Sequence, residues 1–170
     1  MEVQNQLVVG MSEIQVASGP TRYTCLGLGS CIGLCALDPF SGVSGAIHVM
    51  LPEAFPNRPV DRPGKFADTG LPELLHLMEL AGAIRSKIIA AYAGGASVFQ
   101  YGTGVPGVQD VGHRNAEAVR KVARELGINV IAHDTGGSNG RTIYMQSDTG
   151  EMVVKTISAG EKVLCSLRRP

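Results

Sequence analysis

The chain has 170 residues, a mass of 17.8 kDa and a net charge of zero, with 15 basic side chains balancing 15 acidic ones. A hydrophobic content of 44% at this length supports a single domain, residues 1–170, whose core needs neither disulfides nor a metal ion. The scattered basic residues argue against a nucleic-acid-binding face, and no apolar run approaches the roughly 20 residues that span a bilayer.

Strand patterns separated by turns dominate the first third of the chain. We expect strands at residues 7–9, 14–16, 23–28, 32–37 and 46–51. The last two flank a segment in which Pro39 and Gly42 favour a reversal, so they should form an antiparallel hairpin. The segment 52–64 contains four prolines and favours neither helix nor strand, which predicts a mobile surface loop.

Two amphipathic helices and further strands follow. The first helix is expected from a cap at Asp68 or Thr69 to a stop at Gly82, and the second from a cap near Asn115 to a stop at Gly127. Further strands are expected at 87–92, 128–132, 142–145, 152–157 and 163–167, with a glycine-rich stretch at 94–112. About ten strands and two helices predict an α/β fold in which the helices pack on a mixed sheet.

Three patterns suggest a nucleotide site, an aspartic protease and a zinc site, but their spacing or the predicted elements around them argue against each. The glycines from Gly27 to Gly33 resemble a dinucleotide fingerprint, yet the third falls one residue late and a strand pattern follows it. The triplet Asp-Thr-Gly occurs at Asp68, Asp134 and Asp148, which do not lie in equivalent loops that could form an aspartic protease pair. The four histidines are too far apart in sequence for a zinc motif. We therefore expect no metal and no cofactor.

The four cysteines differ in their predicted roles. The first five residues lack the charge and the apolar stretch of a signal peptide, which predicts a cytoplasmic protein whose cysteines are thiols. Cys35 lies within an apolar run and is expected in the core, and Cys165 has no evident partner. Cys31 follows a glycine-rich turn, a position that suits either a small buried side chain or a nucleophile.

A base for Cys31 is available if the hairpin has the register that its turn favours. That register pairs Gly33 with His48 and makes Cys31 a diagonal neighbour on the same face, with backbones about 7–8 Å apart. A slip of one residue would place the two side chains on opposite faces. A thiol nucleophile requires such an imidazole to accept its proton, and the backbone amides around Gly29 and Ser30 are candidates to bind an oxyanion.

Five motifs occur in one order along the chain. They are LGLGSC at 26–31, HVMLP at 48–52, GGA at 94–96, GHRN at 112–115 and DTGGSNGR at 134–141. Together they resemble the CheD family, chemoreceptor glutamine deamidases of bacterial and archaeal chemotaxis, over about residues 6–157. The resemblance implies a three-layer α/β sandwich related to the deamidase domain of cytotoxic necrotizing factor toxins. It also implies a catalytic Cys–His pair at Cys31 and His48.

The resemblance further implies a third, orienting residue, a threonine six positions before the nucleophile. That position is Cys25 here, with Thr24 beside it, so the role falls on one of these two or has been replaced. Three polar residues of the other motifs, Arg114, Asn139 and Arg141, are candidate supports, although turn formation and helix capping explain their motifs more simply.

The implied reaction is hydrolysis of a glutamine carboxamide through a thioester on Cys31, without a cofactor. The implied substrate is the cytoplasmic helical region of a methyl-accepting chemotaxis receptor. The protein is expected to associate with a membrane only by binding this receptor. Glutamyl methyl esters are a second candidate substrate, since they share the acyl intermediate. A CheC-type phosphatase is the implied partner, and a non-catalytic regulator of that phosphatase is the alternative function. A cysteine peptidase or transglutaminase would use the same nucleophile.

Overall fold

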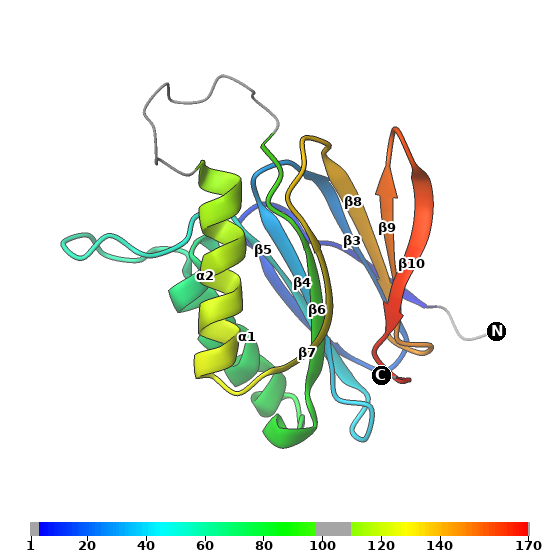
Figure 1. Ribbon diagram of the computed structural model, residues 1–170. Helices are drawn as coiled ribbons and strands as arrows, with labels where there is room; N and C mark the ends of the chain where they lie inside the picture. Colours follow the sequence, from blue (N-terminus) through cyan, green and yellow to red (C-terminus); the bar gives the residue numbers. More distant parts are fainter. Residues whose placement is uncertain (1–3, 98–109, 170) are drawn as a thin grey trace.

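The computed structural model describes residues 4–97 and 110–169, which contain ten strands and two α-helices (Figure 1). The strands are β1 (Asn5–Val8), β2 (Ile14–Ser18), β3 (Thr21–Leu28), β4 (Ile32–Leu37), β5 (Val43–Val49), β6 (Ile89–Gly94), β7 (Asn129–Thr135), β8 (Arg141–Gln146), β9 (Glu151–Thr156) and β10 (Gly160–Ser166). The helices are α1 (Ala67–Leu80) and α2 (Val111–Glu125), with short 3-10 turns at Pro63–Lys65 and Arg85–Lys87. Most of the glycine-rich stretch expected at 94–112 lies outside the described residues.

The strands form two five-stranded mixed sheets rather than one. The first has the order β1-β3-β8-β9-β10 and the second β2-β5-β4-β6-β7, with parallel pairs β1/β3 and β6/β7. Both helices cover one face of the second sheet, and the first sheet packs on its other face (Figure 1). The molecule therefore has three layers, one of helices and two of strands.

The central strand β4 is buried on both sides because it lies in the middle layer. Its side chains alternate: Ile32 and Leu34 belong to the core under the helices, whereas Cys35 and Leu37 belong to the core between the sheets. This double burial explains its continuous apolar sequence. Cys35 is 0% exposed, which confirms its expected place in the core.

The predicted hairpin is confirmed in its register. Strands β4 and β5 pair antiparallel, with Ile32 opposite Val49 and Gly33 opposite His48. The reversal is stabilised by Asp38, whose carboxylate accepts hydrogen bonds from the backbone N–H of Phe40 (2.9 Å) and of Ile84 (2.8 Å). The second strand begins at Val43, earlier than expected, since the residues directly after the turn also pair with β4.

Both helices end as expected, but the expected caps are wrong. Helix α1 begins at Ala67, and the carboxylate of Asp68 accepts a hydrogen bond from the N–H of Ala54 (3.0 Å) instead of capping the helix. Helix α2 is capped by Asp110, which accepts from the N–H of His113 (2.9 Å). Asn115 therefore lies inside the helix, where it is fully buried.

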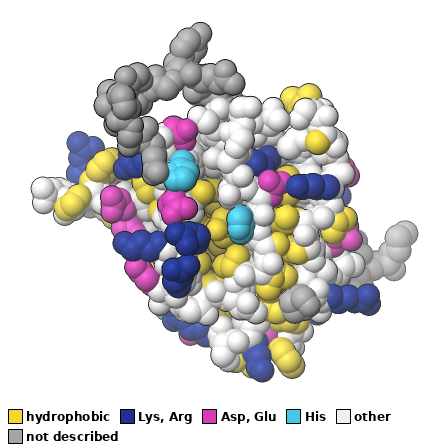
Figure 2. Space-filling view, in the orientation of Figure 1, with side chains coloured by type: hydrophobic (Ala, Val, Ile, Leu, Met, Phe, Trp, Pro, Cys, Tyr) yellow, Lys and Arg dark blue, Asp and Glu magenta, His cyan; other side chains and the backbone are white. Residues whose placement is uncertain are grey.

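The surface around α2 carries charges of both signs. Figure 2 shows basic and acidic side chains together over this helix, where Arg120 pairs with Glu117 and Lys121 with Glu125. None of the helices within residues 4–97 and 110–169 is long and apolar enough to cross a membrane.

Candidate active site

Cys31 and His48 both lie at one end of the central hairpin. Cys31 directly precedes β4, and His48 lies one residue before the end of β5, opposite Gly33. The alternation along β4 places Cys31 on the same face as Gly33, and Cys31 packs against the core between the sheets. The side chains of Cys31 and His48 therefore share the face that the hairpin register predicted.

The imidazole of His48 is held in one tautomer. Its Nδ1 lies 3.1 Å from the carbonyl oxygen of Val9, which can only accept, so Nδ1 carries the proton and Nε2 the lone pair. The side chain is 3% exposed, and its Nε2 has no hydrogen-bond partner within the described part of the chain. Burial lowers the pKa of His48 from 6.5, which favours the neutral ring. The arrangement is that of an oriented, unprotonated base.

Neither residue expected to orient His48 makes this contact. Cys25 is completely buried between the sheets, and desolvation raises the pKa of its thiol to about 12. The side chain of Thr24 points to the opposite face of β3 from Cys25, although its carbonyl accepts a hydrogen bond from the N–H of Val9 (2.8 Å). Val9 orients His48 through its backbone.

The backbone before β4 is anchored through its carbonyl groups. Those of Gly29 and Cys31 accept from the N–H groups of Ala96 (2.8 Å) and Gly95 (2.9 Å), and that of Ser30 accepts from Nδ2 of Asn115 (2.9 Å). In a trans peptide the next N–H points away from the carbonyl, so the N–H groups of Ser30 and Cys31 are directed away from these anchors. Neither donates to an acceptor among residues 4–97 and 110–169. Backbone N–H groups without an acceptor in these ranges are candidates to bind an oxyanion.

Cys31 itself is half-buried, and desolvation raises the pKa of its thiol above 9.0. No opposing positive charge contributes to this shift. Both shifts favour the uncharged form of the group, a thiol at Cys31 and a neutral imidazole at His48.

Close backbone contacts explain the glycines of two motifs. Gly94 has a φ of +123°, and a Cβ there would overlap the carbonyl oxygen of Cys31. Gly95 has a φ of +66°, and its Cβ would lie 2.7 Å from the carbonyl oxygen of Gly112. A side chain at Gly112 would in turn overlap the carbonyl oxygen of Ala96. Glycine at these positions lets the end of β6 pass between Cys31 and the start of α2.

Substituting Gly94 by alanine should damage both stability and the site. We expect Gly94→Ala to lower the free energy of unfolding by about 1–3 kcal/mol more than Gly82→Ala does. Gly82 is the matched control because it also has a positive φ (+110°) but no atom within 4 Å of an added Cβ. Thermal melting and the alkylation rate of Cys31 measure the two effects, and equal behaviour of the variants would contradict this account of Gly94.

The three candidate supports lie in different surroundings. Arg141 is 8% exposed and donates to the carbonyl oxygens of Gly94 (3.2 Å) and Gly136 (2.8 Å) and to Oδ1 of Asp134 (3.3 Å). It thus joins the ends of β6 and β7 beside Cys31. Asn139 is exposed and donates to Oγ of Ser158 (3.2 Å). Gly136 has a positive φ, as expected for this turn.

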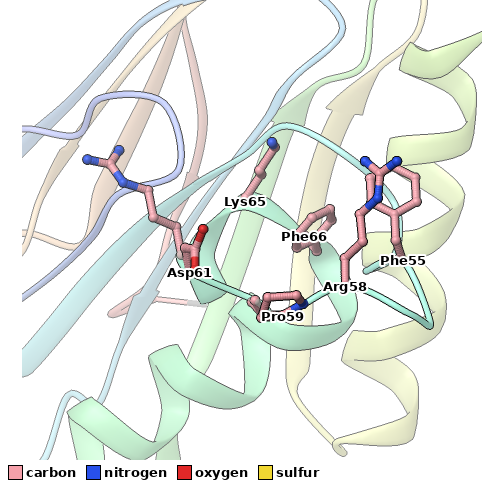
Figure 3. Close-up of a pocket in the computed structure, with 8 residues that line it drawn as sticks. Phe55, Arg58, Pro59, Asp61, Lys65 and Phe66 are labelled. Atoms are coloured by element: carbon pink, nitrogen blue, oxygen red, sulfur yellow. The ribbon is translucent and has the colours of Figure 1, made fainter.

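Arg114 is exposed at the start of α2 and borders a groove next to the candidate site. This groove, of roughly 310 Å³, is also lined by Leu51, Phe55 and Val111. A second pocket, of roughly 340 Å³, is also lined by Phe55, together with Arg58 and Phe66 (Figure 3). There the Arg58 guanidinium stacks over the Phe55 ring, with its carbon 5.1 Å from the ring centroid. The segment that follows His48 lines both hollows, and the start of α2 completes the first.

From the sequence, two residues, Val9 and Asn115, were assigned no role in the site. Val9 contributes only a backbone carbonyl, for which no sequence signal exists. Asn115 does carry a signal, because it precedes buried Val119 by four residues and so lies on the apolar stripe of α2. Within the described ranges, no three His, Cys, Asp or Glu side chains gather in a way that could hold a metal ion.

Comparison with known proteins gives one consistent result. Residues 50–156 match the family described as CheD chemotactic sensory transduction. Several relatives bear the name "Probable chemoreceptor glutamine deamidase CheD", including the following three. The protein of Clostridium novyi (strain NT) is 36% identical over 161 residues, 95% of this chain and 99% of its own. That of Desulfitobacterium hafniense (strain DSM 10664 / DCB-2) is 41% identical over 162 residues, 95% of this chain and 100% of its own.

The third relative, from Clostridium tetani (strain Massachusetts / E88), is 40% identical over 162 residues, 95% of this chain and 97% of its own. The family match begins at residue 50, after both Cys31 and His48. The alignments with the relatives cover nearly the whole chain and therefore extend through both residues.

Proposed function

The chain belongs to the CheD family of chemotaxis proteins, and from this premise we propose that Cys31 and His48 carry its chemoreceptor glutamine deamidase activity. The observation that supports these roles is the buried Nε2 of His48, whose lone pair lacks a partner within the described residues and lies on the face of Cys31. Such a base is what a neutral thiol needs to become a nucleophile.

The first half-reaction forms a thioester. His48 Nε2 takes the Cys31 thiol proton while the sulfur bonds to the carboxamide carbon of a receptor glutamine. The oxygen becomes an oxyanion, bound by the N–H groups of Ser30 and Cys31. As the oxyanion collapses, the C–N bond breaks and the imidazolium gives its proton to the departing nitrogen, which leaves as ammonia.

In the second half-reaction, water hydrolyses the thioester, with His48 as the base that activates it. His48 Nε2 removes a proton from a water molecule, whose oxygen attacks the thioester carbon. Collapse of the second oxyanion breaks the C–S bond, the imidazolium returns its proton to the Cys31 sulfur, and glutamate remains on the receptor. The same thioester would form from a glutamyl methyl ester with methanol as the leaving group, so we include ester hydrolysis in the proposal.

The decisive experiment uses folded cytoplasmic fragments of the cognate receptors. Peptide mass spectrometry should map specific glutamine-to-glutamate conversions, and the ammonia released should equal the glutamate formed. Methanol release from a methylated fragment tests the esterase activity. New peptide termini or crosslinks in place of ammonia would indicate a peptidase or transglutaminase, and unchanged glutamines would contradict the proposal for those receptors.

The expected CheC-type phosphatase is a separate proposal about a partner. A regulatory complex would depend on surface contacts rather than on thioester chemistry, so Cys31→Ala should still bind such a phosphatase. A cytoplasmic location belongs to the same proposal, because both this partner and the receptor fragment act there. The proposed kinship with cytotoxic necrotizing factor deamidases rests on the shared Cys–His chemistry.

The burial of the pair predicts a pH dependence of the reaction. Protonated His48 cannot accept the thiol proton, so kcat/KM should rise with pH through the lowered His48 pKa, with a midpoint below 6.5. The thiol pKa lies above 9.0, so the neutral pair persists on the alkaline side of that midpoint. Initial rates of ammonia release between about pH 4.5 and pH 9 measure the profile. A midpoint above 6.5 would contradict the proposed resting state.

A further inference from the structure

The carboxamide of Asn115 joins the two parts of the candidate site. Its Nδ2 donates to the carbonyl oxygen of Ser30 (2.9 Å) and to that of Met50 (2.9 Å). Ser30 directly precedes the nucleophile, and Met50 follows the base by two residues. Asn115 is 0% exposed, so the donor of both bonds is fully buried.

The orientation of this carboxamide follows from its partners. Carbonyl oxygens only accept, so the atom that contacts both must be the nitrogen, which has two protons to donate. Its oxygen, Oδ1, is buried and has no partner in the part of the chain that the structure describes. An unsatisfied buried acceptor is costly, and an apolar residue on this stripe of α2 would avoid that cost. The two donated bonds are therefore the feature of Asn115 that an apolar residue could not supply.

One of these bonds determines where an oxyanion donor points. The Ser30 carbonyl and the Cys31 N–H belong to the same trans peptide and point in opposite directions. By holding the carbonyl against α2, Asn115 turns the Cys31 N–H away from the helix. The second bond, to the Met50 carbonyl, holds the backbone after His48 to the same Asn115 side chain. The segments that carry Cys31 and His48 are therefore both attached to Asn115.

We propose, building on the proposed function, that Asn115 is a positioning residue of the deamidase, which holds the Ser30–Cys31 peptide so that the Cys31 N–H binds the oxyanion. Asn115 acts through the backbone and does not touch the substrate. Its loss should therefore impair the step that develops negative charge on oxygen more than the reactivity of the thiol itself.

Two reactions of Cys31 separate these effects. Deamidation passes through an oxyanion, whereas alkylation by iodoacetamide displaces iodide from a saturated carbon and needs only the thiol and its base. In Asn115→Ala we expect kcat for a receptor fragment to fall about 10- to 100-fold, with KM changed by less than about threefold. The alkylation rate and its pH profile should stay within about twofold of those of the wild type. Asn115→Asp keeps the side-chain volume but places a carboxylate oxygen, an acceptor, against two carbonyl oxygens. Its kcat should fall at least as far as that of Asn115→Ala.

Val119→Ala is the matched control for lost stability. Val119 lies one turn later on the same buried stripe of α2 and has no side-chain donor for either carbonyl, so this variant should melt earlier while keeping kcat. If Asn115→Ala does not fold, Asn115→Ser, whose hydroxyl retains one donor, is measured in its place with the same two readouts.

Two results would overturn the assignment. A folded Asn115 variant whose kcat stays within about threefold of the wild type would show that the peptide needs no such anchor. Equal losses of kcat and of alkylation would show that Asn115 merely maintains the fold around Cys31. Wild-type protein is assayed in parallel: if it releases no ammonia, the proposed function has failed and this inference falls with it, whereas an active wild type makes any failure specific to Asn115.

Discussion

Cys31→Ala should abolish the conversion of receptor glutamines to glutamate. Without the sulfur there is no thioester, and a water molecule at that position is a far weaker nucleophile than a thiolate. Loss of a nucleophile that forms a covalent intermediate costs on the order of 10⁴-fold or more in kcat. Mass spectrometry of the receptor fragment, run until the wild-type reaction is complete, measures the remaining conversion.

Cys165→Ala is the matched control for this prediction. Both thiols are partly buried, and burial raises the pKa of each, but Cys165 lies in β10 on the other sheet. Cys165→Ala should therefore keep the wild-type rate. Residual deamidation by Cys31→Ala, or loss of activity in Cys165→Ala alone, would assign the chemistry to another residue.

His48→Ala should lower kcat about 10²- to 10⁴-fold without abolishing the reaction. The thiol and the N–H groups of Ser30 and Cys31 remain, but nothing accepts the thiol proton or donates one to the leaving nitrogen. The alkylation of Cys31 near neutral pH should slow as well, because the raised thiol pKa leaves little thiolate without the base. Rates of ammonia release and of alkylation measure both effects.

His76→Ala is the control, since His76 is exposed on α1 and undergoes the same side-chain change. A His48→Ala variant whose alkylation rate equals that of the wild type would show that the imidazole does not act on Cys31. Thermal melting of both variants checks that the His48 substitution has not simply unfolded the site.

Local sequence was sufficient to predict the central hairpin and its register. That register determines that His48 lies on the same face as Cys31. A turn at Pro39 and Gly42 sets the register of β4 and β5, and the two-residue periodicity of a strand then decides which side chains share a face. The same local rules located the strands and the ends of the helices. The caps were predicted wrongly because Asp68 bonds to a distant N–H, and Asp110, not Asn115, caps α2.

The division of the strands into two sheets was not determined locally. A strand buried between helices and a second sheet has the same apolar pattern as one covered by helices on both faces, so β4 is compatible with either arrangement. Only the packing of β3 and β8 against β4 decides between them. That packing also buries Cys25. The burial of His48 near the end of β5, which likewise depends on the folded structure, lowers its pKa.

The sequence by itself predicted Cys31 and His48 as the candidate catalytic pair, and it determined their shared face and, through its ordered motifs, the family. Tertiary structure alone decided what prepares them for reaction: the Val9 carbonyl that selects the His48 tautomer, and the Asn115 amide that holds the Ser30 carbonyl. The physical reason is that these contacts join groups far apart in the chain, and half of each contact is backbone. Every residue carries a backbone carbonyl, so its role depends on where folding places it.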